Sequence, residues 1–222
     1  MDDTIDDVIN INVGVLGHVD SGKTALCATI STVLSTAALD KSPQSQEKGI
    51  TMDLQFSALR LIDDVGKRNL NVTLVDCPGH ASLIRTIMGG ANIIDAVLMV
   101  IDVTKGIQTQ TAECLIIAEI TCEHILFLLN KVDLIPEAQR ADKLDKLQKG
   151  LSKAFADSKF AKPLIFIPFS TKSEPPIGVS QLHSELQKLP TPIRAKTEAP
   201  LIFNVDHCFA MKGKRSEERR VG

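Results

Sequence analysis

Hydrophobic residues follow two patterns along this chain. Continuous apolar runs, the pattern of buried strands, lie at 10–16, 70–75, 95–102, 125–129 and 164–169. Apolar residues three or four positions apart mark amphipathic helices at 22–34, 109–121, 136–158 and 178–188, and two glycines end a short helix predicted over 81–88. Because strands and helices alternate, the pattern predicts an α/β fold with a doubly wound, mostly parallel sheet.

The segment 53–62 completes the sheet in a different way. Its apolar residues alternate with polar ones, and a polar turn at 63–69 separates it from the next strand. This spacing predicts an edge strand in a hairpin, which brings the sheet to six strands. The polar segment 40–50 shows neither pattern and is expected to be a loop. Three prolines predict a semi-rigid linker over 190–200, and 201–211 restarts as a strand without a partner in the chain.

Composition narrows the class of protein. The 222 residues are 44% hydrophobic, enough for a sizeable core, and 25 basic against 27 acidic residues give a net charge of -2. Any RNA contact must therefore be local. No apolar run reaches the ~20 residues of a membrane span, the acidic N-terminus is no secretory signal, and five scattered cysteines argue against disulfides or a zinc site. We expect the protein to be monomeric and cytoplasmic, and a nuclear pool is compatible with these features.

The segment 17–24 reads GHVDSGKT and fits G-x-x-x-x-G-K-[ST] between a predicted strand and a predicted helix. Glycines let backbone amides approach a phosphate chain closely, and the positive end of the helix dipole reinforces them. Lys23 adds a point charge near the outer phosphates, and Thr24 offers a hydroxyl to Mg²⁺. The predicted phosphate contacts are Asp20, Ser21, Gly22, Lys23, Thr24 and Ala25.

Two further motifs follow predicted strands. Asp76 and Gly79 fit D-x-x-G, in which the carboxylate can hold Mg²⁺ through a water and the glycine amide can bind the terminal phosphate. In the NKVD motif at 130–133, the Asp133 carboxylate can accept hydrogen bonds from N1–H and the exocyclic amine of guanine, a donor pair that adenine lacks. Asn130 is expected to bond the base and a neighbouring loop, and the Lys131 stem to lie on the ring plane.

A third base contact is expected after the last strand, where Ser170, Thr171 and Lys172 can lend a backbone N–H to the guanine carbonyl. Three motifs in this order, each at a strand end, predict GTP binding. A P-loop kinase or ATPase is an alternative that Asp133 opposes, because such a site must tolerate adenine. A nucleotide-binding scaffold without hydrolysis is a second alternative.

GHVDSGKT, DCPGH and NKVD together resemble the translational GTPases. The resemblance implies a P-loop G domain whose first switch ends at Thr51, a second Mg²⁺ ligand, and whose second switch starts at Asp76. It also implies that His80 orients or activates the attacking water when the ribosome docks. The catalytic residues it implies are His80, Lys23 and Thr51, and the metal ligands are Thr24, Thr51 and Asp76.

Several stretches look closer to the eukaryotic selenocysteine-specific elongation factors than to elongation factor Tu. The most telling is SLIRT at 82–86, where elongation factor Tu is expected to read DYVKN. This resemblance implies GTP-dependent capture of selenocysteyl-tRNA and its delivery to ribosomes at recoded UGA codons, with a selenocysteine-insertion RNA element engaged through a missing C-terminal region or an adaptor. An elongation factor Tu-like carrier of other aminoacyl-tRNAs is the alternative, as is a GTP-binding module that delivers no tRNA.

The resemblance also implies a domain organisation. An acidic extension at 1–9 precedes the G domain at 10–189, and the linker at 190–200 leads to the first strand of a truncated β-barrel domain at 201–213. Asp206 and His207 match positions of the family's selenol pocket, and a polar turn at a strand end is the less favoured alternative. The tail at 214–222 departs from the family and resembles a sequencing-library adapter read in frame, so we expect it to be non-native.

Overall fold

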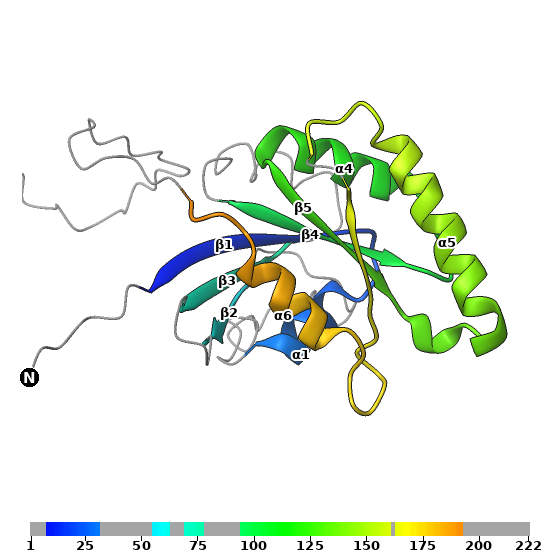
Figure 1. The fold of residues 1–222 in the computed structure, drawn as a ribbon, viewed down its shortest axis with the longest axis horizontal. Coiled ribbons are helices and arrows are strands. Elements are labelled where there is room, and N and C mark those ends of the chain that lie inside the picture. Colours follow the sequence, from blue (N-terminus) through cyan, green and yellow to red (C-terminus); the bar gives the residue numbers. More distant parts are fainter. Residues whose placement is uncertain (1–7, 32–54, 63–68, 78–93, 161–162, 193–222) are drawn as a thin grey trace, which may run out of the picture.

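The computed structural model describes residues 8–31, 55–62, 69–77, 94–160 and 163–192 (Figure 1). They form six strands, four α-helices and one short 3-10 helix. The strands are β1 (Ile9–Leu16), β2 (Gln55–Leu61), β3 (Leu70–Asp76), β4 (Ala96–Asp102), β5 (His124–Asn130) and β6 (Ile165–Pro168). The helices are α1 (Lys23–Ile30), α4 (Thr109–Thr121), α5 (Glu137–Ala154) and α6 (Val179–Gln187), with η2 (Val132–Leu134) after β5.

The strands form one sheet in the order β2-β3-β1-β4-β5-β6. Only β2 runs antiparallel to its neighbour β3, while every other pair is parallel. The register pairs Val13 of β1 with Leu74 of β3 on one side and with Ala96 of β4 on the other. The predicted α/β fold with a six-stranded, mostly parallel sheet and an antiparallel edge strand is therefore confirmed.

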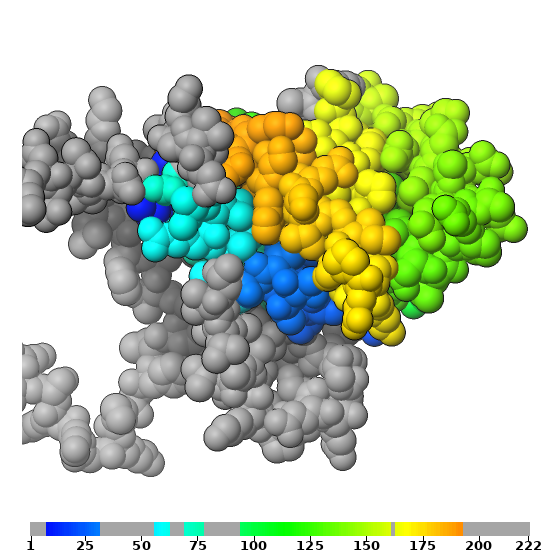
Figure 2. All heavy atoms as spheres, turned by 60° about the horizontal axis from the view of Figure 1, so that its bottom comes forward, coloured from blue at the N-terminus to red at the C-terminus, as the bar shows by residue number. Residues whose placement is uncertain are grey.

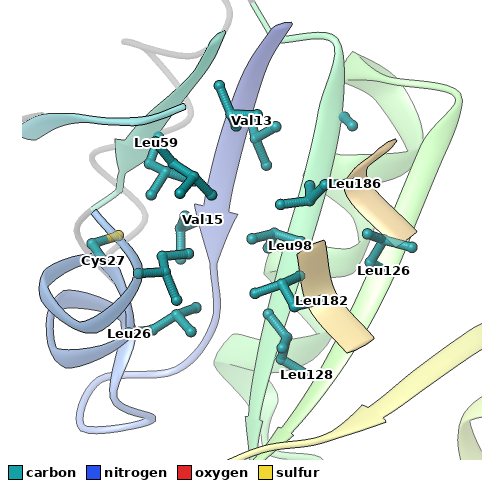
Figure 3. Packing of buried hydrophobic residues seen from close by; sticks show 14 of the residues in the cluster. Val13, Val15, Leu26, Cys27, Leu59, Leu98, Leu126, Leu128, Leu182 and Leu186 are labelled. Atoms are coloured by element: carbon teal, nitrogen blue, oxygen red, sulfur yellow. The ribbon is translucent and has the colours of Figure 1, made fainter. Parts of the chain in front are cut away.

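Helices cover both faces of the sheet, which is why its central strands are apolar on both sides. On one face, Leu26 of α1 and Leu182 of α6 pack over Val15 and Leu98 (Figure 3). Figure 2 shows α1 and α6 as neighbours on this face. On the other face, α4 and α5 cover Phe127. Each fully buried leucine contributes about 1.5–3 kcal/mol, so these two layers fix the sheet and the loops at its edge.

Two helices are shorter than the sequence pattern predicts. The helix predicted over 22–34 ends at Ile30, because Ser31 takes an extended backbone and both its N–H and its hydroxyl bond the carbonyl oxygen of Cys27. The helix predicted over 136–158 ends at Ala154. There Phe155 turns into the core, with its ring centroid 5.4 Å from that of Phe127. Packing of Phe155 on Phe127 accompanies the end of this helix, and the spacing of apolar residues along the chain cannot predict such a contact.

Other expectations lie outside the described residues. They are the loop at 40–50, the short helix at 81–88, the linker at 190–200 beyond residue 192, the strand at 201–211 and the two ends of the chain. Within the described ranges, every helix is too short or too polar to cross a bilayer.

Candidate functional site

The candidate site lies at the edge of the sheet where the parallel strands end. The carboxyl ends of β1, β3, β4, β5 and β6 lie at this edge, because parallel strands point the same way. The chain segments carrying the three predicted motifs thus share one edge, as expected for a ligand site in a doubly wound sheet.

The loop after β1 approaches β4 too closely for a side chain at its first glycine. A Cβ at Gly17 would lie 2.3 Å from the carbonyl oxygen of Val100, and Gly17 and Gly22 have φ angles of 149° and 97°. Asp20 also takes a left-handed backbone, with φ of 61°. Gly22 caps α1 without a side-chain hydrogen bond, so the first amides of α1 are not occupied by a capping side chain. This is the backbone geometry that a phosphate group needs.

Lys23 points back over this loop. Its Nζ donates to the carbonyl oxygens of Gly17 at 3.0 Å and His18 at 2.9 Å. Burial lowers the pKa of Lys23, and the negative charge of Asp76 opposes that shift. An ammonium has three donors, so these two carbonyls orient the charge and leave one N–H to meet an anion.

Thr24 and Asp76 supply oxygen atoms beside the loop. The Thr24 hydroxyl donates to Asp76 Oδ2 at 2.7 Å, whereas Asp76 Oδ1 is buried and has no hydrogen-bond partner. Burial raises the pKa of Asp76, against the lowering effects of the Thr24 hydrogen bond and the Lys23 charge. An orphaned carboxylate oxygen next to a hydroxyl fits Mg²⁺, a hard cation that prefers oxygen ligands. Thr51, the other predicted metal ligand, lies outside the described residues.

Asp76→Asn is expected to stabilise the nucleotide-free protein at pH 7, because burial disfavours the charged carboxylate, while weakening its Mg²⁺-dependent nucleotide binding. A raised native pKa means that the stability contribution of Asp76 is present below its unfolded pKa, about 3.9, and is lost as pH rises through the native value. Urea unfolding in EDTA between pH 4 and pH 8 measures this, with exposed Asp157→Asn as control. A less stable Asp76→Asn protein at pH 7 contradicts the expectation.

The loop after β5 is tied directly to the loop after β1. Asn130 Nδ2 donates to the carbonyl oxygen of Ser21 at 2.8 Å, and Lys131 Nζ donates to that of Asp20 at 2.6 Å. Asn130 Oδ1 is buried without a partner, which leaves an acceptor for a ligand group. The predicted contact of Asn130 with a neighbouring loop is thus present in the structure.

Asp133 is held from the loop after β6. The hydroxyl of Ser170, a fully buried residue, donates to Asp133 Oδ1 at 2.6 Å. Ser170 Oγ in turn accepts from Lys172 N and Ser173 N, both at 3.3 Å, and from Ser173 Oγ at 3.0 Å. These donors direct the Ser170 proton toward Asp133, so Asp133 Oδ1 accepts a hydrogen bond that orients the carboxylate.

The sequence interpretation missed three side chains of this edge. Asp102, the last residue of β4, pairs with Lys131 at 2.7 Å. Gln110 Oε1 accepts from Val19 N at 3.4 Å, and Ser173 bonds Ser170 as described above. A buried charge at the end of an apolar strand was the available signal for Asp102. No sequence motif marks the other two.

The structure brings Asp20, Ser21, Gly22, Lys23, Thr24, Asp76, Asn130, Lys131, Asp133 and Ser170 to one edge through the contacts above. Ala25 lies one residue further along α1, and Thr171 and Lys172 lie in the loop after β6. The Lys172 amide bonds Ser170 rather than pointing freely into the site. Predicted site residues outside the described ranges are Thr51, Gly79, His80, Asp206 and His207.

Residues 9–192 match the family of the elongation factor Tu GTP-binding domain. The chain is similar to a selenocysteine-specific elongation factor of Mus musculus, 49% identical over 219 residues that cover 93% of this chain and 37% of the relative. It is also similar to a selenocysteine-specific elongation factor of Methanocaldococcus jannaschii, 36% identical over 206 residues that cover 92% of this chain and 41% of the relative. The chain thus spans about two fifths of these relatives.

Two solved structures have a similar fold. Elongation factor SelB of Methanococcus maripaludis, in complex with the GTP analogue GPPNHP, superposes with a TM-score of 0.64 at 30% identity, over 87% of this chain and 37% of that one. A bacterial selenocysteine-specific elongation factor, EF-Sec, superposes with a TM-score of 0.63 at 24% identity, over 81% of this chain and 28% of that one. The second likeness supports the fold alone.

Proposed function

This chain belongs to the family of the elongation factor Tu GTP-binding domain, and from that premise we propose that it is a translational GTPase that binds GTP and GDP and hydrolyses GTP to GDP and phosphate. One observation carries the proposal. Asp133, held by Ser170 as a hydrogen-bond acceptor, belongs to the same loop as Asn130, whose side chain bonds the phosphate loop. A guanine-selective acceptor and a phosphate-binding backbone are therefore parts of one connected site.

Different residues of the site have different roles in nucleotide binding and hydrolysis. Lys23 and the amides at the start of α1 stabilise negative charge that develops on the outer phosphates. Mg²⁺, when bound through Thr24 and Asp76, would screen the same charge. By resemblance, Thr51 reports the terminal phosphate and His80 orients the attacking water. Loss of that phosphate would then release the two switches, a change from order to disorder.

We extend the proposal to the cargo and the partners, which the names of the longer relatives suggest. The mouse and archaeal relatives are named selenocysteine-specific elongation factors, which favours selenocysteyl-tRNA over other aminoacyl-tRNAs as the cargo. On this proposal the ribosome is the second partner, UGA codons are the sites of delivery, and Asp206 and His207 contribute to a selenol pocket. A cytoplasmic location fits this role.

The experiment that tests the GTPase is competition for a fluorescent guanine nucleotide, followed by a hydrolysis assay. GTP and GDP are expected to displace mant-GDP at far lower concentrations than ATP, because adenine offers Asp133 no donor pair. His80→Ala is the matched variant for hydrolysis: it should keep the GTP affinity and lose ribosome-stimulated turnover. Equal displacement by ATP removes the GTPase proposal, and unchanged stimulated turnover removes His80 from the mechanism.

A further inference from the structure

Two residues of the described chain other than glycine have a positive φ, and a single ammonium group joins them. They are Asp20 in the phosphate loop, with φ of 61°, and Lys131 in the base-binding loop, with φ of 66°. Lys131 Nζ donates to the carbonyl oxygen of Asp20 at 2.6 Å. A side chain disfavours this backbone conformation, which persists only where surrounding contacts hold it. The contact between these loops therefore helps to hold both conformations.

The same ammonium is anchored on a buried carboxylate that belongs to neither loop. Lys131 Nζ lies 2.7 Å from Asp102 Oδ2, and the Asp102 side chain is only 5% exposed. The other oxygen, Oδ1, accepts from the Thr104 amide at 2.8 Å and from the Thr104 hydroxyl at 2.6 Å. Both oxygens are thus occupied, and the carboxylate has one fixed orientation.

The backbone around Asp102 is also fixed. Its carbonyl oxygen accepts from Lys105 N at 3.1 Å and from Gly106 N at 2.8 Å, while Val103 N donates to the carbonyl oxygen of Asn130 at 3.1 Å. Asp102 is therefore a rigid point at the end of β4, bonded to the turn that follows it. The hydrogen bonds from Lys131 and Thr104 lower the pKa of Asp102 although burial acts to raise it, so the group is charged at neutral pH.

We propose that Asp102 is a positioning residue for the bound nucleotide: by fixing the Lys131 ammonium it holds the phosphate loop and the base-binding loop as one unit. The inference rests on the proposed function, because it needs a nucleotide that contacts both loops. Both carboxylate oxygens of Asp102 are occupied by Lys131 and Thr104, so Asp102 acts through Lys131. Weakening this anchor lets the loops move apart, which speeds nucleotide release.

The test is the rate at which preloaded mant-GDP dissociates into excess GDP. Asp102→Asn is expected to raise this rate by about tenfold or more, because a neutral amide holds the Lys131 ammonium less firmly than a carboxylate does. The matched control is Asp145→Asn, which breaks an aspartate–lysine pair of 2.6 Å on the exposed face of α5. Its rate is expected to stay within twofold of the wild type.

A double-mutant cycle with Lys131→Met separates positioning from a general loss of stability. Methionine keeps the stem of Lys131 and removes the ammonium, so Asp102→Asn should add no further acceleration in that background. The proposal is overturned if the double variant releases mant-GDP at a rate that multiplies the accelerations of the two single variants. It is also overturned if the dissociation rate of Asp102→Asn stays within twofold of the wild type.

If Asp102→Asn does not fold, the dissociation rate of mant-GDP from Thr104→Val tests the proposal instead. This substitution removes one hydrogen bond that orients the carboxylate and is expected to raise the rate several-fold; an unchanged rate overturns the proposal. A wild-type protein that retains no mant-GDP rejects the GTPase proposal itself, an outcome distinct from wild-type retention with unchanged variants.

Discussion

Asp133→Asn is expected to lower the affinity for GDP by about 30- to 3,000-fold and to create affinity for xanthosine diphosphate. Removing one partner of a buried charged hydrogen bond costs about 2–5 kcal/mol, and each 1.4 kcal/mol is roughly a factor of ten. Guanine presents an amine where xanthine presents a carbonyl, so an amide N–H at position 133 pairs with xanthine. The carbonyl oxygen of the new amide can still accept from Ser170, which keeps the loop in place.

Competition between mant-GDP and unlabelled GDP, xanthosine diphosphate and ADP measures this change. Asp142→Asn makes the same substitution at an exposed position of α5 and should leave all three affinities as they are. If Asp133→Asn left GDP preferred over xanthosine diphosphate by the wild-type ratio, the carboxylate would not be reading the base. Guanine selectivity would then have to come from the backbone after β6.

Gly22→Ala is expected to weaken GDP binding by about 30-fold or more. A Cβ at Gly22 would lie 2.3 Å from Asn130 Nδ2, and the φ of 97° is one that an L side chain rarely adopts. The Asn130 side chain must then leave the carbonyl oxygen of Ser21, to which it now donates. Loss of a buried hydrogen bond costs about 1–3 kcal/mol and the left-handed backbone about 1–2 kcal/mol more. Together they amount to at least about 2 kcal/mol, or roughly 30-fold in affinity.

Gly150→Ala is the matched control for this change. A Cβ there meets nothing within 4 Å, and Gly150 lies inside α5. Alanine should therefore raise the free energy of unfolding by about 0.5–1 kcal/mol without changing nucleotide affinity. Urea unfolding and mant-GDP titration of both variants make the comparison. Wild-type affinity in Gly22→Ala would show that Asn130 is not needed where the structure places it.

Much of the fold could be predicted because its signals are local. The run from Ala96 to Asp102 is buried at every position, and such a run is typical of a central parallel strand. The alternating pattern of β2 gave the antiparallel edge. Helix ends were harder to predict. Helix α5 ends where Phe155 packs on Phe127 of β5, a contact between residues 28 positions apart in the sequence.

The candidate site divides in the same way. Glycine spacing and the NKVD tetrapeptide predict which backbone and which carboxylate would contact a nucleotide, because ligand chemistry restricts the residue types at those positions. The residues that orient them are not restricted in this way. Gln110 bonds Val19 and Asp102 bonds Lys131 only because segments far apart in the sequence meet at one sheet edge.

The sequence by itself determined the alternation of strands and helices, the glycine-rich loop after β1 and the carboxylate proposed to read the base, since each depends on residues adjacent in the chain. Only the tertiary structure decided how the loops are held together. Lys131 reaches Asp20 across 111 positions and Asp102 across 29. Such contacts depend on strand order, β1 beside β4 and β4 beside β5, and on the fixed direction of parallel strands, neither of which a local pattern encodes.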